Sequence, residues 1–237
     1  LYMIKAAHIA LMVQLLEKQS IPHGKSQIKY AGSVVKSRYA EANVLFIIDQ
    51  LVKGVITAIT GLLQGLGSIL PIPGLQSLMG LVRVFLRVSV GLIDEVIIAY
   101  AIKTESQNPW NSAQTALVLY AQNAKGMLKN AVWLTLIIYG LSLLVFLLFL
   151  APATAFVYYM PGAWSAGSVV FALLCAWSIK AAILEPFAIA CLLQSYFKAI
   201  EGQKPDPTWE SRLSSISKKF GKLKDRATSW VGITPGN

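Results

Sequence analysis

The sequence predicts an all-α, polytopic integral membrane protein that contains a helical hairpin and amphipathic surface helices. From Asn130 to Phe197 the only charged side chains are those of Lys180 and Glu185, and no soluble domain can bury a tract of this kind. Backbone amides in lipid must be hydrogen-bonded within the protein, which leaves helices or a closed barrel. The run Val132–Leu150 does not alternate apolar with polar residues, so it is not a barrel strand.

Composition and charge agree with this class. Hydrophobic residues make up 55% of the chain and charged residues 14%, against about 25% charged residues in an average soluble protein. The net charge of +10 is concentrated before Pro71, between Lys103 and Lys129, and after Phe197. This distribution suits contact with anionic lipid headgroups. We expect no nucleic-acid partner, because no basic stripe lies on a soluble domain.

Residues 1–42 are expected to form an N-terminal helix and a basic cytoplasmic segment. Leu1–Lys18 gathers apolar residues on one helix face, so it is either an interfacial helix or the end of a span. Because the chain begins without an initiating Met, we expect a further N-terminal piece, which could hold another span or a signal. The segment Gln19–Arg38 is polar and basic, which predicts a loop or short helix in water.

Residues 43–103 predict a helical hairpin that either spans the membrane or dips into it. Its first arm, Asn43–Leu70, is long enough to cross a bilayer, which takes about 20 residues. Asp49 and Lys53 in this arm are four residues apart, so they can pair on one helix face. The apolar sequence Pro71–Gly74 then forces a turn.

The second arm of the hairpin, Gln76–Lys103, leaves two topologies open. It carries Arg83, Arg87, Asp94 and Glu95. A charge at the centre of a span costs about 2.5–3.5 kcal/mol. Either the arm crosses with its charges facing a protein or water-filled interior, or the hairpin only dips into one leaflet. The sequence slightly favours the dipping hairpin.

Residues 104–200 predict an amphipathic helix followed by two transmembrane helices. Asn108 precedes a proline and should cap the amphipathic helix. The spans are expected at Ala131–Leu150 and Ser168–Pro186. The uncharged segment between them, Ala151–Gly167, carries the aromatic residues typical of an interfacial turn. The proline at the end of the second span should kink or end that helix.

The positive-inside rule orients the chain. The segments Gln19–Arg38 and Lys103–Lys129 and the tail after Phe197 are basic. The predicted turns Pro71–Gly74 and Ala151–Gly167 contain no Lys or Arg. We therefore expect a multi-pass protein of the plasma (inner) membrane with its basic loops and its C-terminus in the cytoplasm.

Residues 201–237 predict a basic amphipathic tail. Asp206 precedes a proline and should begin its helix, after which apolar residues recur at steps of four and three. The pattern suits a helix on the cytoplasmic membrane surface. The same spacing is a heptad and fits a coiled coil or partner-binding helix. The residues expected to contact lipid are Trp209, Lys218, Lys219, Lys222, Lys224, Arg226 and Trp230.

Charged residues in the apolar helices are candidates for an intramembrane polar site. Lys180 and Glu185 are five residues apart, about 140° around an α-helix, so we do not expect them to pair with each other. Each then needs a partner on another element or must reach the interface. Their role is either transport, gating or ligand binding, or a structural interhelical pair. The full candidate set is Lys180, Glu185, Asp49, Lys53, Arg83, Arg87, Asp94 and Glu95.

Enzymatic and metal-binding motifs are missing from the sequence. His8 and His23 are the only histidines, and neither stands at a metal-ligand spacing. There is no glycine-rich phosphate loop and no nucleophile motif. We therefore expect no catalytic residue, metal or cofactor, and we do not expect an enzyme.

Two stretches, Ala113–Asn130 and Val170–Gly202, resemble pieces of the choline transporter-like family, and they look equally like multipass membrane proteins of bacteria. The first is an amphipathic helix that leads into a span. The second is a span whose end carries an acid, then an aromatic residue and a charged exit. The chain is far shorter than members of that family, and no substrate-site motif can be carried over. The resemblance implies a multi-span helical protein with a transport activity.

Two functions are expected from these patterns. The first is a membrane-embedded assembly or accessory component of scaffold type, oligomeric and in contact with anionic lipid on the cytoplasmic side. The alternative is a small oligomeric transporter or channel of the choline transporter-like type. In either case the chain should form a homo-oligomer or be a subunit of a membrane complex.

Overall fold

The chain is all-α over the residues that the computed structural model describes, which are 2–18, 26–39, 42–66, 95–159 and 165–230. No strand occurs among them, which confirms the predicted helical class. The helices in chain order are α1 (Tyr2–Leu16), α2 (Gln27–Tyr39), α3 (Ala42–Leu66), a helix at 95–103, α5 (Pro109–Gln122), α6 (Ala124–Tyr159), α7 (Ser165–Ile179), the π-helical turn η2 (Lys180–Leu184), α8 (Glu185–Ala199), α9 (Pro207–Ile216) and α10 (Lys218–Ser229).

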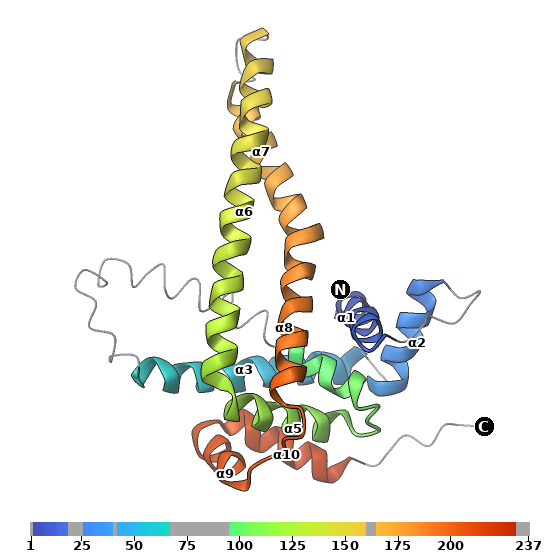
Figure 1. Ribbon diagram of the computed structural model, residues 1–237. Coiled ribbons are helices and arrows are strands. Elements are labelled where there is room, and N and C mark those ends of the chain that lie inside the picture. The colour runs from blue at the N-terminus through green and yellow to red at the C-terminus, as the bar shows by residue number, and fades with distance from the viewer. Residues whose placement is uncertain (1, 19–25, 40–41, 67–94, 160–164, 231–237) are drawn as a thin grey trace.

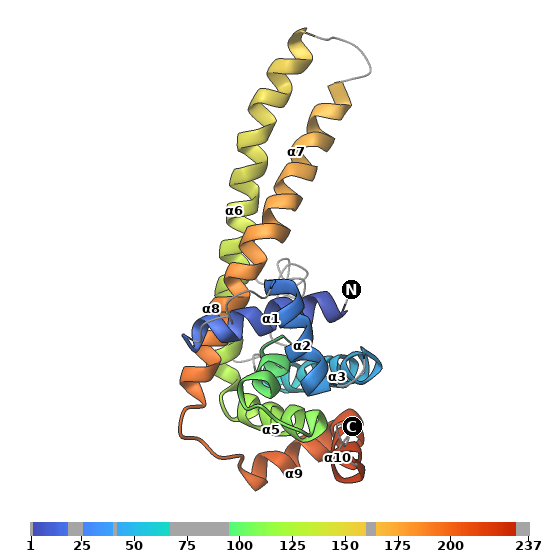
Figure 2. The ribbon, with the colours of Figure 1, turned by 90° about the vertical axis from the view of Figure 1, so that its right-hand side faces the viewer.

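The helices form two parts, a long hairpin and a base. In the hairpin, α6 lies beside α7, and η2 and α8 continue α7 downwards (Figure 1). The other helices form the base, and α3, α5 and α10 run across the direction of the hairpin (Figures 1 and 2). The lower part of α8 packs into the base, where the Tyr196 hydroxyl donates to the Ala116 carbonyl oxygen at 3.0 Å. The hairpin is therefore anchored in the core of the base.

Two helical stretches in the hairpin are long and apolar enough to cross a membrane. They cover Ala124–Ala155 and Gly167–Ala199. In the most apolar 18-residue segment of each stretch, only 11% and 17%, respectively, is buried inside the protein. The core helix of a soluble protein would be mostly buried, so these helices present their apolar side chains outwards.

The first of these helices is longer than the sequence predicted. We expected a turn at Ala151–Gly167, but α6 continues to Tyr159 with Pro152 inside the helix. A proline removes one backbone hydrogen bond and usually kinks a soluble helix. Apolar helices tolerate this loss more often because neighbouring helices and side chains satisfy the freed carbonyl groups.

The first arm of the predicted 43–103 hairpin is a helix, but it belongs to the base. One side of α3 is buried, including Leu45, Val52 and Ile56. The helix runs across the direction of α6 instead of alongside it (Figure 1). It is not among the described helices that are apolar enough to cross a membrane. The predicted turn Pro71–Gly74 lies outside the described residues.

Both predicted helix caps are present. The Asn108 side-chain oxygen accepts from the backbone amides of Trp110 and Asn111, each at 3.1 Å. The Asp206 carboxylate accepts from the amide of Thr208 at 2.7 Å. These bonds satisfy amide groups that a helix start leaves without intrahelical partners.

The C-terminal tail folds back as two helices, not as the single amphipathic helix that we predicted. Ser217 has extended dihedral angles, so it ends α9 and caps α10. Leu213, Phe220 and Leu223 from the predicted apolar stripe are fully buried. They face the core because α10 packs against α5 and α3, and α9 packs against α5. This part of the stripe therefore cannot enter lipid.

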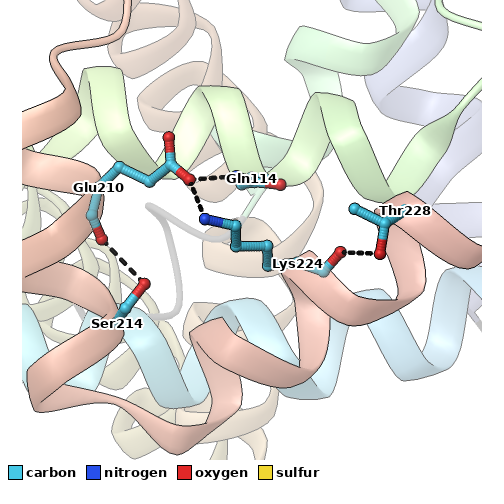
Figure 3. A network of polar contacts seen from close by, with 5 residues as sticks. All are labelled: Gln114, Glu210, Ser214, Lys224 and Thr228. Carbon is cyan, nitrogen blue, oxygen red and sulfur yellow. Dashed lines mark hydrogen bonds and ion pairs between the residues drawn. The ribbon is translucent and has the colours of Figure 1, made fainter.

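Polar contacts fix the tail to α5. The Glu210 carboxylate accepts from Lys224 Nζ at 2.7 Å and from Gln114 Nε2 at 3.2 Å (Figure 3). Asn108 Nδ2 donates to the Ala227 carbonyl oxygen at 2.9 Å. In both views α9 and α10 lie on the side of α5 that faces away from the hairpin (Figures 1 and 2). The lipid contact expected of the basic tail residues stays a prediction.

Phe220→Ala should destabilise the base by about 3–5 kcal/mol, because it leaves a cavity at a fully buried position between α10, α5 and α3. The free energy of unfolding would be measured by denaturant titration in detergent. The matched control is Lys222→Ala on the exposed face of α10, which should stay within about 0.5 kcal/mol of the unmodified chain. Equal effects of the two substitutions would contradict the packing described above.

Candidate functional site

The candidate site lies where the hairpin enters the base. An open pocket of about 400 Å³, here called the foot pocket, is formed by α1, the helix at 95–103, η2 and α8. Its lining is mostly apolar, with a few ionisable groups among the apolar ones. The lining residues are Ile4, Lys5, His8, Ile9, Glu95, Ala181, Glu185, Pro186 and Ile189.

A π-helical turn shapes the hairpin side of this pocket. Pro186 has no amide hydrogen, so it cannot make the usual bond to the carbonyl group four residues before it. The residue before it, Glu185, instead donates its amide hydrogen to the Lys180 carbonyl oxygen, five residues back. This pattern defines a π-turn, and such turns are rare in helices and frequent at functional sites. The predicted disturbance at this proline is thus a widened turn within a continuous helix.

The π-turn corrects our prediction that Lys180 and Glu185 would not pair. Lys180 Nζ donates to Glu185 Oε1, and the two form an ion pair. The prediction was wrong because it assumed α-helical geometry, whereas a wider turn brings residues five apart onto one side. Lys180 also lies 5.3 Å from the centre of the Tyr139 ring on α6. Its side chain is 17% exposed, whereas that of Glu185 is 40% exposed and lines the pocket.

A second ion pair joins the other two walls of the foot pocket. Lys5 Nζ on α1 lies 2.8 Å from Glu95 Oε1 on the helix at 95–103. Glu95 was one of the predicted site residues, but Lys5 and His8 were not. Their spacing of three residues puts them on the same face of α1, which is a local pattern. Nothing in the sequence, however, indicates that this face meets Glu95 and Glu185.

The remaining predicted site residues lie elsewhere. Asp49 and Lys53 pair at 2.9 Å on α3, as their spacing predicted, and Asp49 is fully buried in the base. This pair is not part of the foot pocket. Arg83, Arg87 and Asp94 lie outside the described residues. The structure therefore brings two of the predicted residues, Glu95 and Glu185, to one pocket.

The foot pocket contains both ionisable and apolar groups. Within the described part of the chain, no three His, Cys, Asp or Glu side chains gather in a way that could hold a metal ion. The pocket walls are mostly apolar, and two lysine–carboxylate ion pairs lie at them. These are Lys5–Glu95, which lines the pocket, and Lys180–Glu185, of which only Glu185 lines it. Such a site can hold a ligand that has both a charged part and an apolar part.

Comparisons of the chain with protein-family models, with curated proteins and with solved structures find no match. The similarity to the choline transporter-like family thus stays a prediction.

A double-mutant cycle at Lys180 and Glu185 tests the ion pair across the π-turn. Lys180→Met and Glu185→Gln should each lower the melting temperature in detergent, because each leaves one charge without its partner. The free energy of unfolding of the double variant should fall by less than the sum of the two single losses. The coupling energy should be about 1 kcal/mol, since Glu185 is partly solvated. Strictly additive effects would mean that the two side chains do not interact.

Proposed function

We propose that the protein is a membrane-embedded assembly or accessory component of scaffold type. In this proposal the hairpin inserts into the bilayer and the base lies at the cytoplasmic membrane surface. The observation that carries the proposal is the exposure of large apolar side chains along both hairpin arms. These are Trp133, Leu136, Ile137, Leu141, Leu143, Leu144, Leu147 and Leu148 on α6, Val169, Val170, Phe171, Leu173, Leu174 and Trp177 on α7, and Ile183 and Phe187 below them.

Lipid is the environment that suits this surface. Leu148 is 70% exposed and Trp177 is 65% exposed, although water would penalise each by about 25 cal/mol per Å² of apolar area. Contiguous apolar patches of this kind mark membrane or protein contacts. Three hydroxyl side chains of the hairpin bond to backbone carbonyl groups of their own helix, as Thr135 Oγ1 does to the Ala131 carbonyl oxygen at 2.7 Å. Such bonds suit an apolar surrounding, because they need no water.

The base supports a placement at the membrane surface. Lys125, Lys129 and Lys198 are exposed near the ends of α6 and α8, where the hairpin meets the base. Basic residues in this position suit anionic headgroups on the cytoplasmic side. A hairpin that crosses the bilayer would leave α3, which runs across it, parallel to the membrane plane (Figure 1). This arrangement favours the surface or dipping alternative for the first arm.

The geometry supports a scaffold more than a transporter. The two candidate spans among the described residues cannot by themselves enclose a pathway, so these helices of one copy would not conduct. The two charges in the apolar part of the hairpin, Lys180 and Glu185, also neutralise each other. The alternative is a small oligomeric transporter or channel of the choline transporter-like type. One observation favours it, because ionisable residues within apolar helices often mark transport pathways. Both candidates call for a homo-oligomer or a larger membrane complex.

Insertion of the hairpin is tested by Leu144→Arg combined with Leu148→Arg. Two arginines in an exposed apolar segment should cost about 2.5–3.5 kcal/mol each and release the chain from the membrane fraction during carbonate extraction. Leu15→Arg on α1 is the matched control, since Leu15 is equally exposed but lies outside the hairpin. Unchanged retention of the double variant would contradict membrane insertion.

The two candidate functions differ in what Glu185→Gln does. A scaffold should show no ion flux in proteoliposomes, and the substitution should loosen its oligomer, as measured by light scattering of the purified protein. A transporter should show protein-dependent flux that the substitution abolishes while the oligomer remains intact. The second result would replace the scaffold by the transporter.

A further inference from the structure

The foot pocket has an apolar neighbour. A second open pocket, of about 430 Å³, lies between α1 and α2. It is lined by Ile4, Ala7, His8, Leu11, Ile28, Ala31, Gly32 and Lys36. The two pockets share Ile4 and His8, so they adjoin each other, and together they are here called the two-lobed site. One lobe is rich in charge and the other is nearly all apolar, which is the division found in a lipid molecule.

Among the described residues, two lysine–carboxylate pairs lie at the charged lobe. Glu95 faces Lys5 across 2.8 Å, and Glu185 is joined to Lys180 from behind the pocket. His8 makes no side-chain hydrogen bond to any other described residue, and it lies where the two lobes meet. A headgroup with one positive and one negative charge complements this lobe. An anionic headgroup would meet two carboxylates with no cation of its own to offer them.

Exposed apolar side chains line the apolar lobe and lie beside the charged lobe. Ile4 is 74% exposed and Ile28 is 79% exposed, although both line the apolar lobe. Ile183 and Phe187, on the hairpin segment next to the charged lobe, are also at least 60% exposed. An acyl chain could therefore pass from the side of the hairpin into the apolar lobe along apolar surface.

We propose that the two-lobed site binds one phospholipid whose headgroup joins a phosphate to a primary ammonium. Lys5 and His8 donate to the phosphate oxygens, and Glu185 accepts from the ammonium. A carboxylate has room for this bond beside Lys180, because its two oxygens accept several hydrogen bonds. A primary ammonium donates such charge-assisted bonds, whereas a trimethylammonium has no N–H to donate. The inference rests on the proposed placement of the hairpin in the membrane.

Native mass spectrometry of the full chain in detergent tests this inference. The protein would be mixed with equal amounts of phosphatidylethanolamine, phosphatidylcholine and phosphatidylglycerol, and singly bound lipid would be counted. We expect phosphatidylethanolamine to be bound in preference, and we expect His8→Ala and Glu185→Gln each to lower its binding about tenfold. Glu201→Gln, the same chemical change on an exposed acid outside the site, should leave binding unchanged.

One further variant, Ile28→Trp, and a second readout separate the possible failures. Because Glu185→Gln also breaks the ion pair with Lys180, His8→Ala is the cleaner probe, and Ile28→Trp should block the apolar lobe and abolish the preference. Equal binding of the three lipids, or a preference for phosphatidylglycerol, would overturn the inference. If the chain is still retained in the membrane after carbonate extraction, the proposed function would stand. Carbonate release of the unmodified chain would overturn the proposed function, and this inference with it.

Discussion

Under the proposed placement of the hairpin in lipid, the constraint on which the structure depends is that polar groups in the hairpin find partners within the protein. The arms present apolar side chains outwards, and in lipid the polar atoms among them would have only each other and the backbone as partners. Ser142 Oγ donates to the Ile138 carbonyl oxygen at 2.7 Å, and Thr154 Oγ1 donates to the Ala151 carbonyl oxygen at 2.8 Å. The two charges obey the same constraint, because Lys180 and Glu185 bond to each other. The widened turn before Pro186 is what allows them to do so.

The base follows the opposite pattern, with its apolar side chains inside. Its core joins segments that are far apart in the sequence, such as Leu117 and Tyr120 on α5, Tyr196 on α8 and Phe220 on α10. Tyr120 is completely buried, and this burial raises the pKa of its hydroxyl. The lower half of α8 belongs to this core, whereas its upper end belongs to the hairpin. The helix α8 therefore links the hairpin, whose apolar side chains are exposed, to the base, whose apolar side chains are buried.

Features that depend on a few neighbouring residues could be predicted from the sequence. The caps at Asn108 and Asp206 and the pair Asp49–Lys53 are local, and the structure shows all three. The helical class followed from the long apolar tract. The Lys180–Glu185 pair could not be predicted because it depends on a π-turn, and α-helical periodicity gives the wrong angle. The burial of Phe220 could not be predicted either, since a stripe that faces a protein core looks the same as one that faces lipid.

The foot pocket lies beyond local reasoning for a different reason. Its walls come from α1, the helix at 95–103 and the η2–α8 junction, and no short pattern relates Lys5 to Glu95 or His8 to Glu185. Only the packing of the hairpin on the base brings these residues together. A pocket that mixes lysine and carboxylate groups is also hard to recognise from composition, because opposite charges cancel in any sum of charge.

The π-turn η2 also sets the rotational alignment between hairpin and base. A π-turn is equivalent to an α-helix that carries one inserted residue. Removal of that residue would turn everything below it by about 100° relative to the arm above. Leu192, Leu193 and Tyr196 would then leave the core of the base and point to its surface. The length of η2, five residues, thus sets the rotation of α8 relative to α7. The number of residues in this turn matters to the fold as much as their identity.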